Sequence, residues 1–345
     1  MKGLLKKIVA LTAVAAMAMT SLIGCGAKSV DNNEVVAVVN DTEIKAGVAN
    51  FYIRYQQSAI ETAYASMLGA DMWSLQLSEE SDETYEESTK ANMIADLQEM
   101  YVLAQHMADY DIALTDEEVA AIDAAAAAFV EENSADVLAK VSGEKEYVAE
   151  VLKLLAISDK MYDAMVADVN TEVSDDEAAQ KKLQYVRFDK STTDENGAAK
   201  EMTEEEIADV KKEAEAFLAE AKSTGSLEAL AGVKELKSYP LTFDSKSTTI
   251  DEKVIKAADA LGENEYAEVI DTDAGFYVIQ LTSLFDREAT DAKKESIVAE
   301  RQNEKYNLVL EGFVEAAETS VNQEVLDKIS LHGLAVTAKK EKEEK

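Results

Sequence analysis

The stretch TDAGFYVIQL, from Thr272 to Leu281, has the pattern of one short β-strand that is entered through a glycine. Its side chains alternate with the two-residue period of a strand. One face carries Phe276, Val278 and Gln280, and the other, more apolar face carries Tyr277, Ile279 and Leu281. The phenol of Tyr277 therefore belongs either to a core or to a place where chemistry is done, and the residues around the strand decide between the two.

The residues upstream of this strand predict a compact α+β unit. A strand is expected at Leu183–Phe188, followed by a polar turn and by a helix that begins with the capping box Thr203–Glu206. A short second helix comes next, and Pro240 places the possible strand Ser238–Phe243 at a sheet edge. With a third helix that ends at Gly262, the predicted order is β-α-α-β-α-β.

Helical periodicity dominates on both sides of this unit. The segment EVVAVVNDTEI predicts a strand at Val35–Val39 and a turn at Asn40 and Asp41, and long helices follow it. After the unit, one helix is expected from about Asp291 to Thr319. The sequence therefore predicts a mostly helical N-terminal lobe at 34–177, the α+β unit at 178–287, a C-terminal helical segment at 288–335 and a charged tail at 336–345.

The composition excludes some classes of function. The chain has 345 residues, with 69 acidic against 34 basic side chains and a formal net charge of −35. This charge argues against nucleic acid, because phosphate binding needs a clustered positive surface, and it is typical of a solvated surface that resists aggregation. The sequence has no histidine and cysteine cluster with zinc spacing and no glycine-rich phosphate loop, so neither a metal nor a cofactor is expected.

Residues 1–24 have the pattern of a secretory signal, in which three lysines precede an apolar run and small residues. The end of this signal, Leu22-Ile23-Gly24-Cys25, resembles a bacterial lipobox. The resemblance implies cleavage before Cys25, a diacylglycerol thioether with acyl chains such as palmitate, and a short polar tether at 25–33. Two acyl chains are enough for stable anchoring to a membrane. The alternatives are an ordinary signal peptide with a chance cysteine and a transmembrane helix.

The lipobox, the strand-turn-helix opening VVAVVNDTEI and the β-α-α-β-α-β unit flanked by helices occur together. In this combination the chain resembles the extracytoplasmic parvulin-type foldases, the PrsA- and SurA-like peptidyl-prolyl isomerases. The resemblance is best in AADALGENEYAEVIDTDAGFYVIQLT, residues 257–282. It implies a SurA-like chaperone lobe built from both chain ends, which the C-terminal helix completes, and a parvulin-like domain inserted between them. It also implies unfolded or nascent secreted proteins as partners, at the outer face of the bacterial cytoplasmic membrane, and allows a homodimer.

The family's site pairs two histidines, and this chain departs from it. Tyr185 and Tyr277 stand at the two positions, while Thr272 keeps the threonine of the last-strand motif. The resemblance places Ile250 and Val254 in the proline pocket. Paired histidines titrate near neutrality, whereas tyrosines ionise near pH 10. We therefore expect isomerase activity to be weak or lost; the alternative is an active peptidyl-prolyl cis-trans isomerase.

Two further hypotheses come from other parts of the sequence. Met67, Met72 and Trp73 lie beside an acidic loop, and such adaptable apolar side chains are typical of client-binding surfaces. The alternative is that they pack against the rest of the protein. A solute-binding lipoprotein is a further alternative, but that class usually shows two α/β domains with repeated strand-helix units.

Overall fold

The structure is a computed structural model that describes residues 17–20, 30–69, 71–78, 81–193, 199–332 and 335–338. It divides into two compact units, and unit 2 is formed by Asn170–Gln302. Unit 1 combines the chain up to Val169 with the chain from Asn303 onward. The α+β fold class, with a small domain inserted into a lobe made from both chain ends, is thus as predicted. Cys25, the predicted lipidation site, lies outside the described residues.

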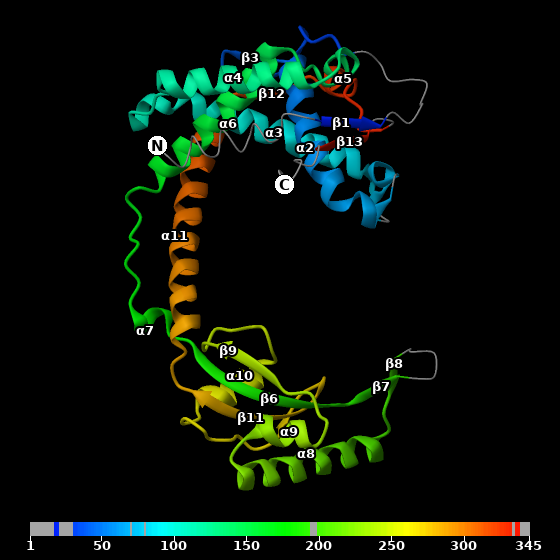
Figure 1. Ribbon diagram of the computed structural model, residues 1–345, viewed down its shortest axis with the longest axis vertical. Helices are drawn as coiled ribbons and strands as arrows, with labels where there is room; N and C mark the ends of the chain where they lie inside the picture. Colours follow the sequence, from blue (N-terminus) through cyan, green and yellow to red (C-terminus); the bar gives the residue numbers. More distant parts are fainter. Residues whose placement is uncertain are drawn as a thin grey trace, which may run out of the picture. The chain divides into compact units, whose positions relative to one another are not determined.

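Unit 2 is built on a four-stranded antiparallel sheet (Figure 1). Its strands, in spatial order, are β10 (Ile270–Asp271), β11 (Gly275–Ser283), β6 (Lys181–Asp189) and β9 (Tyr239–Phe243). Strand β9, which contains Pro240, lies at the edge as expected, where the missing N–H of a proline is tolerated. The strand predicted from TDAGFYVIQL is therefore an inner strand of the sheet.

Helices cover both faces of this sheet. On one face, α8 (Glu204–Thr224) and α9 (Leu227–Val233) pack against Val186, Phe276 and Val278. On the other face, α10 (Glu252–Asp259) packs against Leu183, Tyr277, Ile279 and Leu281. The alternation expected along β11 is therefore real, but both of its faces are buried. The short hairpin of β7 (Ser191–Thr193) and β8 (Ala199–Glu201) completes the unit.

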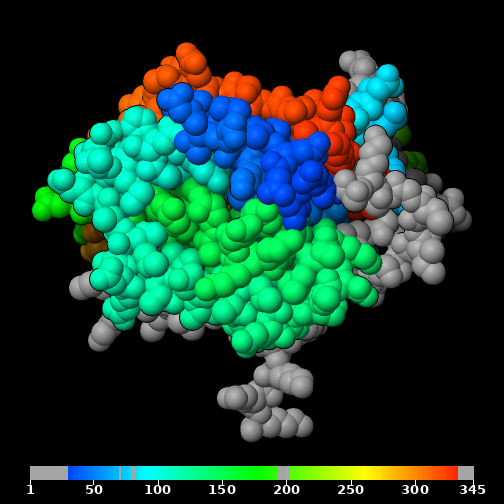
Figure 2. Space-filling model, turned by 90° about the horizontal axis from the view of Figure 1, so that it is seen from above, coloured from blue at the N-terminus to red at the C-terminus, as the bar shows by residue number. Residues whose placement is uncertain are grey.

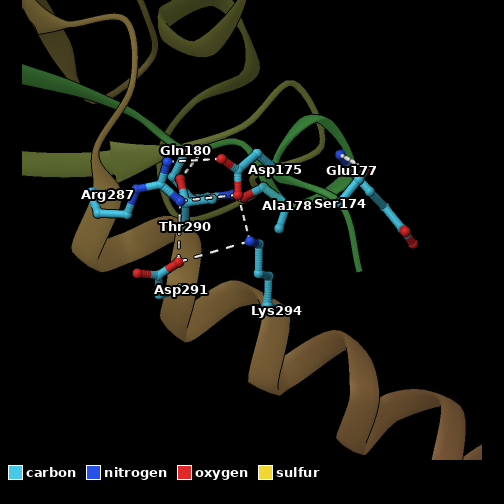
Figure 3. Close-up of polar contacts among 9 residues, drawn as sticks. All are labelled: Ser174, Asp175, Glu177, Ala178, Gln180, Arg287, Thr290, Asp291 and Lys294. Carbon is cyan, nitrogen blue, oxygen red and sulfur yellow. Dashed lines mark hydrogen bonds and ion pairs between the residues drawn. The ribbon is translucent and has the colours of Figure 1, made fainter. Parts of the chain in front are cut away.

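A polar cluster joins the two ends of unit 2 (Figure 3). Asp175, in α7 (Asp175–Ala178), accepts hydrogen bonds from both Nη atoms of Arg287, at 3.0 and 2.8 Å, and one from Lys294. The backbone N–H of Gln180 donates to the hydroxyl of buried Thr290 at 3.1 Å. Arg287 and Lys294 hold the pKa of Asp175 well below its usual range, because both stabilise the charged carboxylate. The segment around α7 is thereby held to the first turns of α11 (Arg287–Ala316).

Unit 1 contains a three-stranded sheet to which both chain ends contribute. Strand β2 (Val35–Val39) pairs with β3 (Thr42–Lys45) through a turn at Asn40, whose φ of 52° lies in the left-handed region. On its other side β2 pairs with β12 (Thr319–Val321), from the C-terminal segment. Figure 2 shows that the two chain ends also lie side by side at the surface, where blue N-terminal residues contact orange and red C-terminal ones. Strand β1 (Met17–Thr20) likewise pairs with β13 (Ala335–Ala338).

Helices form most of unit 1. The long ones are α2 (Ala46–Leu68), α3 (Tyr85–Gln105), α4 (Asp116–Glu132), α6 (Lys145–Met165) and the C-terminal part of α11 (Arg287–Ala316). The short elements are η1 (Met72–Ser74), β4 (Gln76–Ser78), β5 (Ser81–Thr84), η2 (Met107–Tyr110), α5 (Ala135–Val141) and α12 (Gln323–Leu326). The core includes Ile53 of α2, Leu97 of α3 and Leu154 of α6, all buried. Among the described helices, none has the length and apolar character needed to cross a membrane.

Candidate functional site

Three tyrosines and one arginine lie on the α10 face of the sheet in unit 2. Tyr185 of β6 stands opposite Ile279 of β11 on one side and opposite Tyr239 of β9 on the other. Tyr277 stands opposite Arg187, two residues along β6 from Tyr185. Side chains directly opposite in antiparallel strands share a face, as do residues two apart in one strand. The structure thus brings together the two tyrosines that sequence resemblance singled out.

The three rings form a continuous row, which we call the tyrosine row (Tyr277, Tyr185 and Tyr239). The ring centroids of Tyr185 and Tyr277 are 5.6 Å apart at 42°, and those of Tyr185 and Tyr239 are 5.4 Å apart at 29°. Such separations are favourable for aromatic pairs. Exposure increases along the row, from 5% for Tyr277 through half-buried Tyr185 to 44% for Tyr239. The row therefore reaches from the core to the solvent.

Burial and Arg187 determine the electrostatics of the row. Burial raises the pKa of the Tyr185 phenol, and the neighbouring Tyr277 adds to this effect. Arg187 donates a hydrogen bond to the hydroxyl of Tyr277, which raises the pKa of the arginine, and Asp189 pairs with the same guanidinium. The row and its arginine can therefore offer aromatic surface, hydroxyl groups and one cation, but they include no histidine, the side chain that ordinarily titrates near pH 7.

Thr272 lies in the turn between β10 and β11. Its hydroxyl donates to the carbonyl oxygen of Gly275 at 2.8 Å and accepts from the Gly275 N–H at 3.2 Å. Lys190 donates to the carbonyl oxygen of Thr272 at 2.7 Å. Thr272 is buried, and its contacts fix the turn from which the strand carrying Tyr277 begins.

The two residues predicted to line a proline pocket belong to the same cluster as Tyr185 and Tyr277. Val254 is fully buried between α10 and the sheet, whereas Ile250 is half-buried. Asp259, which follows on α10, pairs with Lys181 of β6 at 2.8 Å. Of the two predicted pocket residues, only Ile250 has surface that a peptide can touch in this conformation.

The structure separates the three predicted client-binding residues. Trp73 is 3% exposed, donates to Glu61 at 2.9 Å and stacks on Tyr85 with centroids 5.3 Å apart; Met72 is buried beside it. Met67 is 71% exposed. It belongs to a set of exposed apolar side chains in one stretch of chain, here named the Met67 patch: Tyr64, Met67, Leu68, Leu75 and Leu77.

The histidines of the chain lie in unit 1 and have structural contacts. His106 stacks on Phe313 with ring centroids 3.8 Å apart and pairs with Asp109 at 2.6 Å. His332 pairs with Glu86 at 2.8 Å. Among the residues that the structure describes, no group of histidine, cysteine, aspartate and glutamate could hold a metal ion. Sequence reasoning missed Tyr239 and Arg187; the two-residue spacing of Arg187 from Tyr185 was an available signal.

Part of this chain matches a known family of domains. Residues 159–295 match the family model described as the PPIC-type PPIASE domain. Similar solved structures include the foldase PrsA from Lactococcus lactis, at 11% identity over 86% of this chain and 100% of that one, with a TM-score of 0.35. PrsA from Streptococcus pneumoniae is 20% identical over 74% and 97%, with a TM-score of 0.30.

A third structure, from a study of two SurA-like chaperones in Campylobacter jejuni, is 12% identical over 84% of this chain and 100% of that one, with a TM-score of 0.30. A search of curated proteins found no match. The family model thus confirms the predicted resemblance to a parvulin-type domain for residues 159–295.

Proposed function

Because residues 159–295 contain a PPIC-type PPIase domain, we propose that the chain is an extracytoplasmic foldase in which binding dominates over catalysis. It holds unfolded segments of secreted proteins, and its isomerase activity is weak or lost. The observation that supports this proposal is the tyrosine row, which contains the two tyrosines, Tyr185 and Tyr277, that the sequence resemblance aligns with the family's histidine pair. A lipid on Cys25, at the end of a signal-like segment, would anchor the chain to the outer face of the cytoplasmic membrane.

The chemistry of the row favours weak catalysis. Rotation about a peptide bond crosses a barrier of about 18–20 kcal/mol, and an enzyme lowers it by placing polar groups against the twisted amide. The hydroxyl of Tyr277 is buried and already accepts a hydrogen bond from Arg187. Its ring is held by the core between the sheet and α10. A group fixed in this way has little freedom to follow the amide through the transition state.

The Met67 patch supplies the apolar surface that a binding function needs. Tyr64, Met67 and Leu68 lie on one side of the last turns of α2, because residues three and four apart share a helix face. Exposed apolar groups of this size gain about 25 cal/mol for each Å² that a client covers. The net charge of −35 would keep a complex with an aggregation-prone client in solution.

Two assays on the soluble chain that begins at Gly26 test the proposal. The first measures isomerisation of short X-Pro peptides, with Tyr185→Phe and Tyr277→Phe as variants. The second measures suppression of aggregation of a chemically unfolded protein. Met67→Asp is the binding variant, and Leu308→Asp is its matched control, because Met67 and Leu308 are exposed to similar extents, 71% and 69%.

We expect isomerisation near the uncatalysed rate and clear suppression of aggregation, which Met67→Asp weakens and Leu308→Asp leaves unchanged. A catalysed rate that falls in either phenylalanine variant would mean that the tyrosines form a working site, and the chain would be an active isomerase. Failure to suppress aggregation would remove the binding function.

A further inference from the structure

An apolar groove in unit 1 belongs neither to the tyrosine row nor to the Met67 patch. It has a volume of about 470 Å³ and lies between α4 and α6, with the segment after η2 at one end. Its apolar lining consists of Met107, Ala113, Leu114, Val119, Ile122, Ala149 and Ile157. We call it the α4–α6 groove. Its volume is within the range of roughly 300–1,000 Å³ that is usual for ligand sites.

Short side chains in the lining leave space between the two helices. Ala113 and Ala149 line the groove, and each fills less volume than the leucine and isoleucine beside them. The apolar cluster under the groove has only Ile122 and Ala156 as buried members, with Leu114 and Ala149 half-covered around them. Val119 stands at the mouth and is 47% exposed. Apolar surface left open to water in this way favours an occupant.

Charged side chains surround the mouth, and most of them are acidic. Asp123, Glu146 and Glu150 line the groove together with one cation, Lys153. Lys153 pairs with Glu150 at 3.6 Å, and Lys145 pairs with Asp123 at 3.4 Å. Within the part of the chain that the structure describes, the carboxylate of Glu146 accepts a hydrogen bond from the Tyr147 hydroxyl but has no cation within ion-pair distance. Exposed Asp116 and Glu117 in the first turn of α4 add to the negative field.

We propose that the α4–α6 groove binds a segment of unfolded client in which a large aliphatic or aromatic side chain is followed or preceded by lysine or arginine. The apolar side chain would be covered by Leu114, Val119 and Ile122, and the basic side chain would meet Glu146. This inference rests on the proposed function and names the kind of segment that is selected. The groove therefore sorts client segments by charge as well as by hydrophobicity.

Fluorescence anisotropy with short labelled peptides tests this assignment. One peptide has a leucine flanked by lysines; the second replaces the lysines by glutamates, and the third replaces the leucine by alanine. The variants are Val119→Arg, which puts a cation at the mouth, and Glu146→Gln, which removes only a charge. Val233→Arg and Glu213→Gln are matched controls, because both residues are exposed on unit 2.

The lysine peptide should bind about tenfold more tightly than the glutamate peptide, and the alanine peptide should bind about tenfold more weakly than the lysine peptide. Val119→Arg should weaken binding by about fivefold or more, and Glu146→Gln by roughly twofold to fivefold. The effect of Glu146→Gln should shrink at high salt, because screening weakens exposed charge pairs. Both control variants should bind like the unaltered chain.

Equal binding of the lysine and glutamate peptides would overturn the charge selection. Unchanged peptide binding in Val119→Arg and Glu146→Gln would overturn the placement in the groove. If the chain binds a small uncharged apolar dye but none of the peptides, the assignment of a peptide to the groove is overturned. If aggregation suppression persists in any of these cases, the proposed function stands and only the groove assignment fails. If the unaltered chain binds no peptide and suppresses no aggregation, the proposed function itself fails.

Discussion

Gly275 is the position at which one added methyl group should disturb the tyrosine row most directly. A Cβ atom there would lie 2.3 Å from the carbonyl oxygen of Phe188 and 3.1 Å from the Cα of Asp189. Both are backbone atoms of β6, so no side chain can move aside. The start of β11 must shift away from β6 to admit alanine. This shift also disturbs the carbonyl oxygen of residue 275, which accepts a hydrogen bond from the Thr272 hydroxyl.

The cost of Gly275→Ala follows from these contacts. Overpacking against a rigid neighbour costs about 1–3 kcal/mol, and weakening the two Thr272–Gly275 turn hydrogen bonds adds about 1 kcal/mol each. The lower entropy of the unfolded chain offsets about 0.4–1 kcal/mol of this. The net loss is about 2–4 kcal/mol. In Gly232→Ala, within α9, the new Cβ meets nothing within 4 Å, so this matched control should stabilise the helix by about 0.5–1 kcal/mol.

Hydrogen exchange read by mass spectrometry measures both variants segment by segment. A loss of 2–4 kcal/mol lowers protection by about thirtyfold to several-hundredfold, and it should appear in β6 and β11. The fluorescence of Trp73, which is buried in the core of unit 1, should not change. Unchanged protection in Gly275→Ala, or an equal loss in Gly232→Ala, would refute the argument that backbone contact at Gly275 sets this strand.

Three further predictions concern charge. The lowered pKa of Asp175 means that its ion pairs stabilise unit 2 fully above the ordinary carboxyl pKa of about 4 and lose this contribution as the pH falls further. Hydrogen-exchange protection of residues 174–180 should therefore fall below about pH 4. This fall should be smaller in Asp175→Asn and should be unchanged in the control Asp176→Asn. Glu118→Ala removes the carboxylate that accepts from the Thr115 N–H at 2.8 Å and pairs with Lys160 at 2.8 Å. The free energy of unfolding, measured in urea by the fluorescence of Trp73, should fall by about 2 kcal/mol. The control Glu117→Ala, at an exposed position, should change it little. Any residual isomerisation should have a flat pH profile from about pH 5.5 to 8, and a midpoint near 6.5 would show that a histidine acts after all.

Local signals in the sequence predicted the elements that depend on neighbouring residues. The Thr-x-x-Glu spacing placed the helix start at Thr203, where the capping box forms, and a second box with the same spacing forms at Thr115. A third box, at Thr84, has the same spacing but was hidden in an acidic, serine-rich stretch that reads as a loop. The alternation in TDAGFYVIQL correctly predicted its two faces. Strands of two or three residues, such as β10 and β12, are too short for any periodicity to reveal.

Contacts between distant residues could not be predicted in the same way. Tyr239 joins the row only because β9 pairs with β6 in one register, and a shift by one residue would turn its ring to the other face. The burial of Trp73 depends on Glu61 and Tyr85, which approach it from two different helices. An apolar stretch beside a polar loop is compatible with both an open and a covered position, so the sequence alone left those alternatives open.

The burial of Tyr277 links the fold of unit 2 to its proposed function. Because both faces of β11 are covered by helices, the residue at this position must fill core space as well as serve any site. A tyrosine fills more of that space than a histidine, and its hydroxyl still reaches a partner, Arg187, at the margin of the core. The packing of the sheet against α10 is therefore independent of whether the residue can titrate. Unit 2 thus keeps a packed sheet with exposed Tyr239 and half-buried Ile250 at its surface, and tyrosines stand where the sequence resemblance led us to expect histidines.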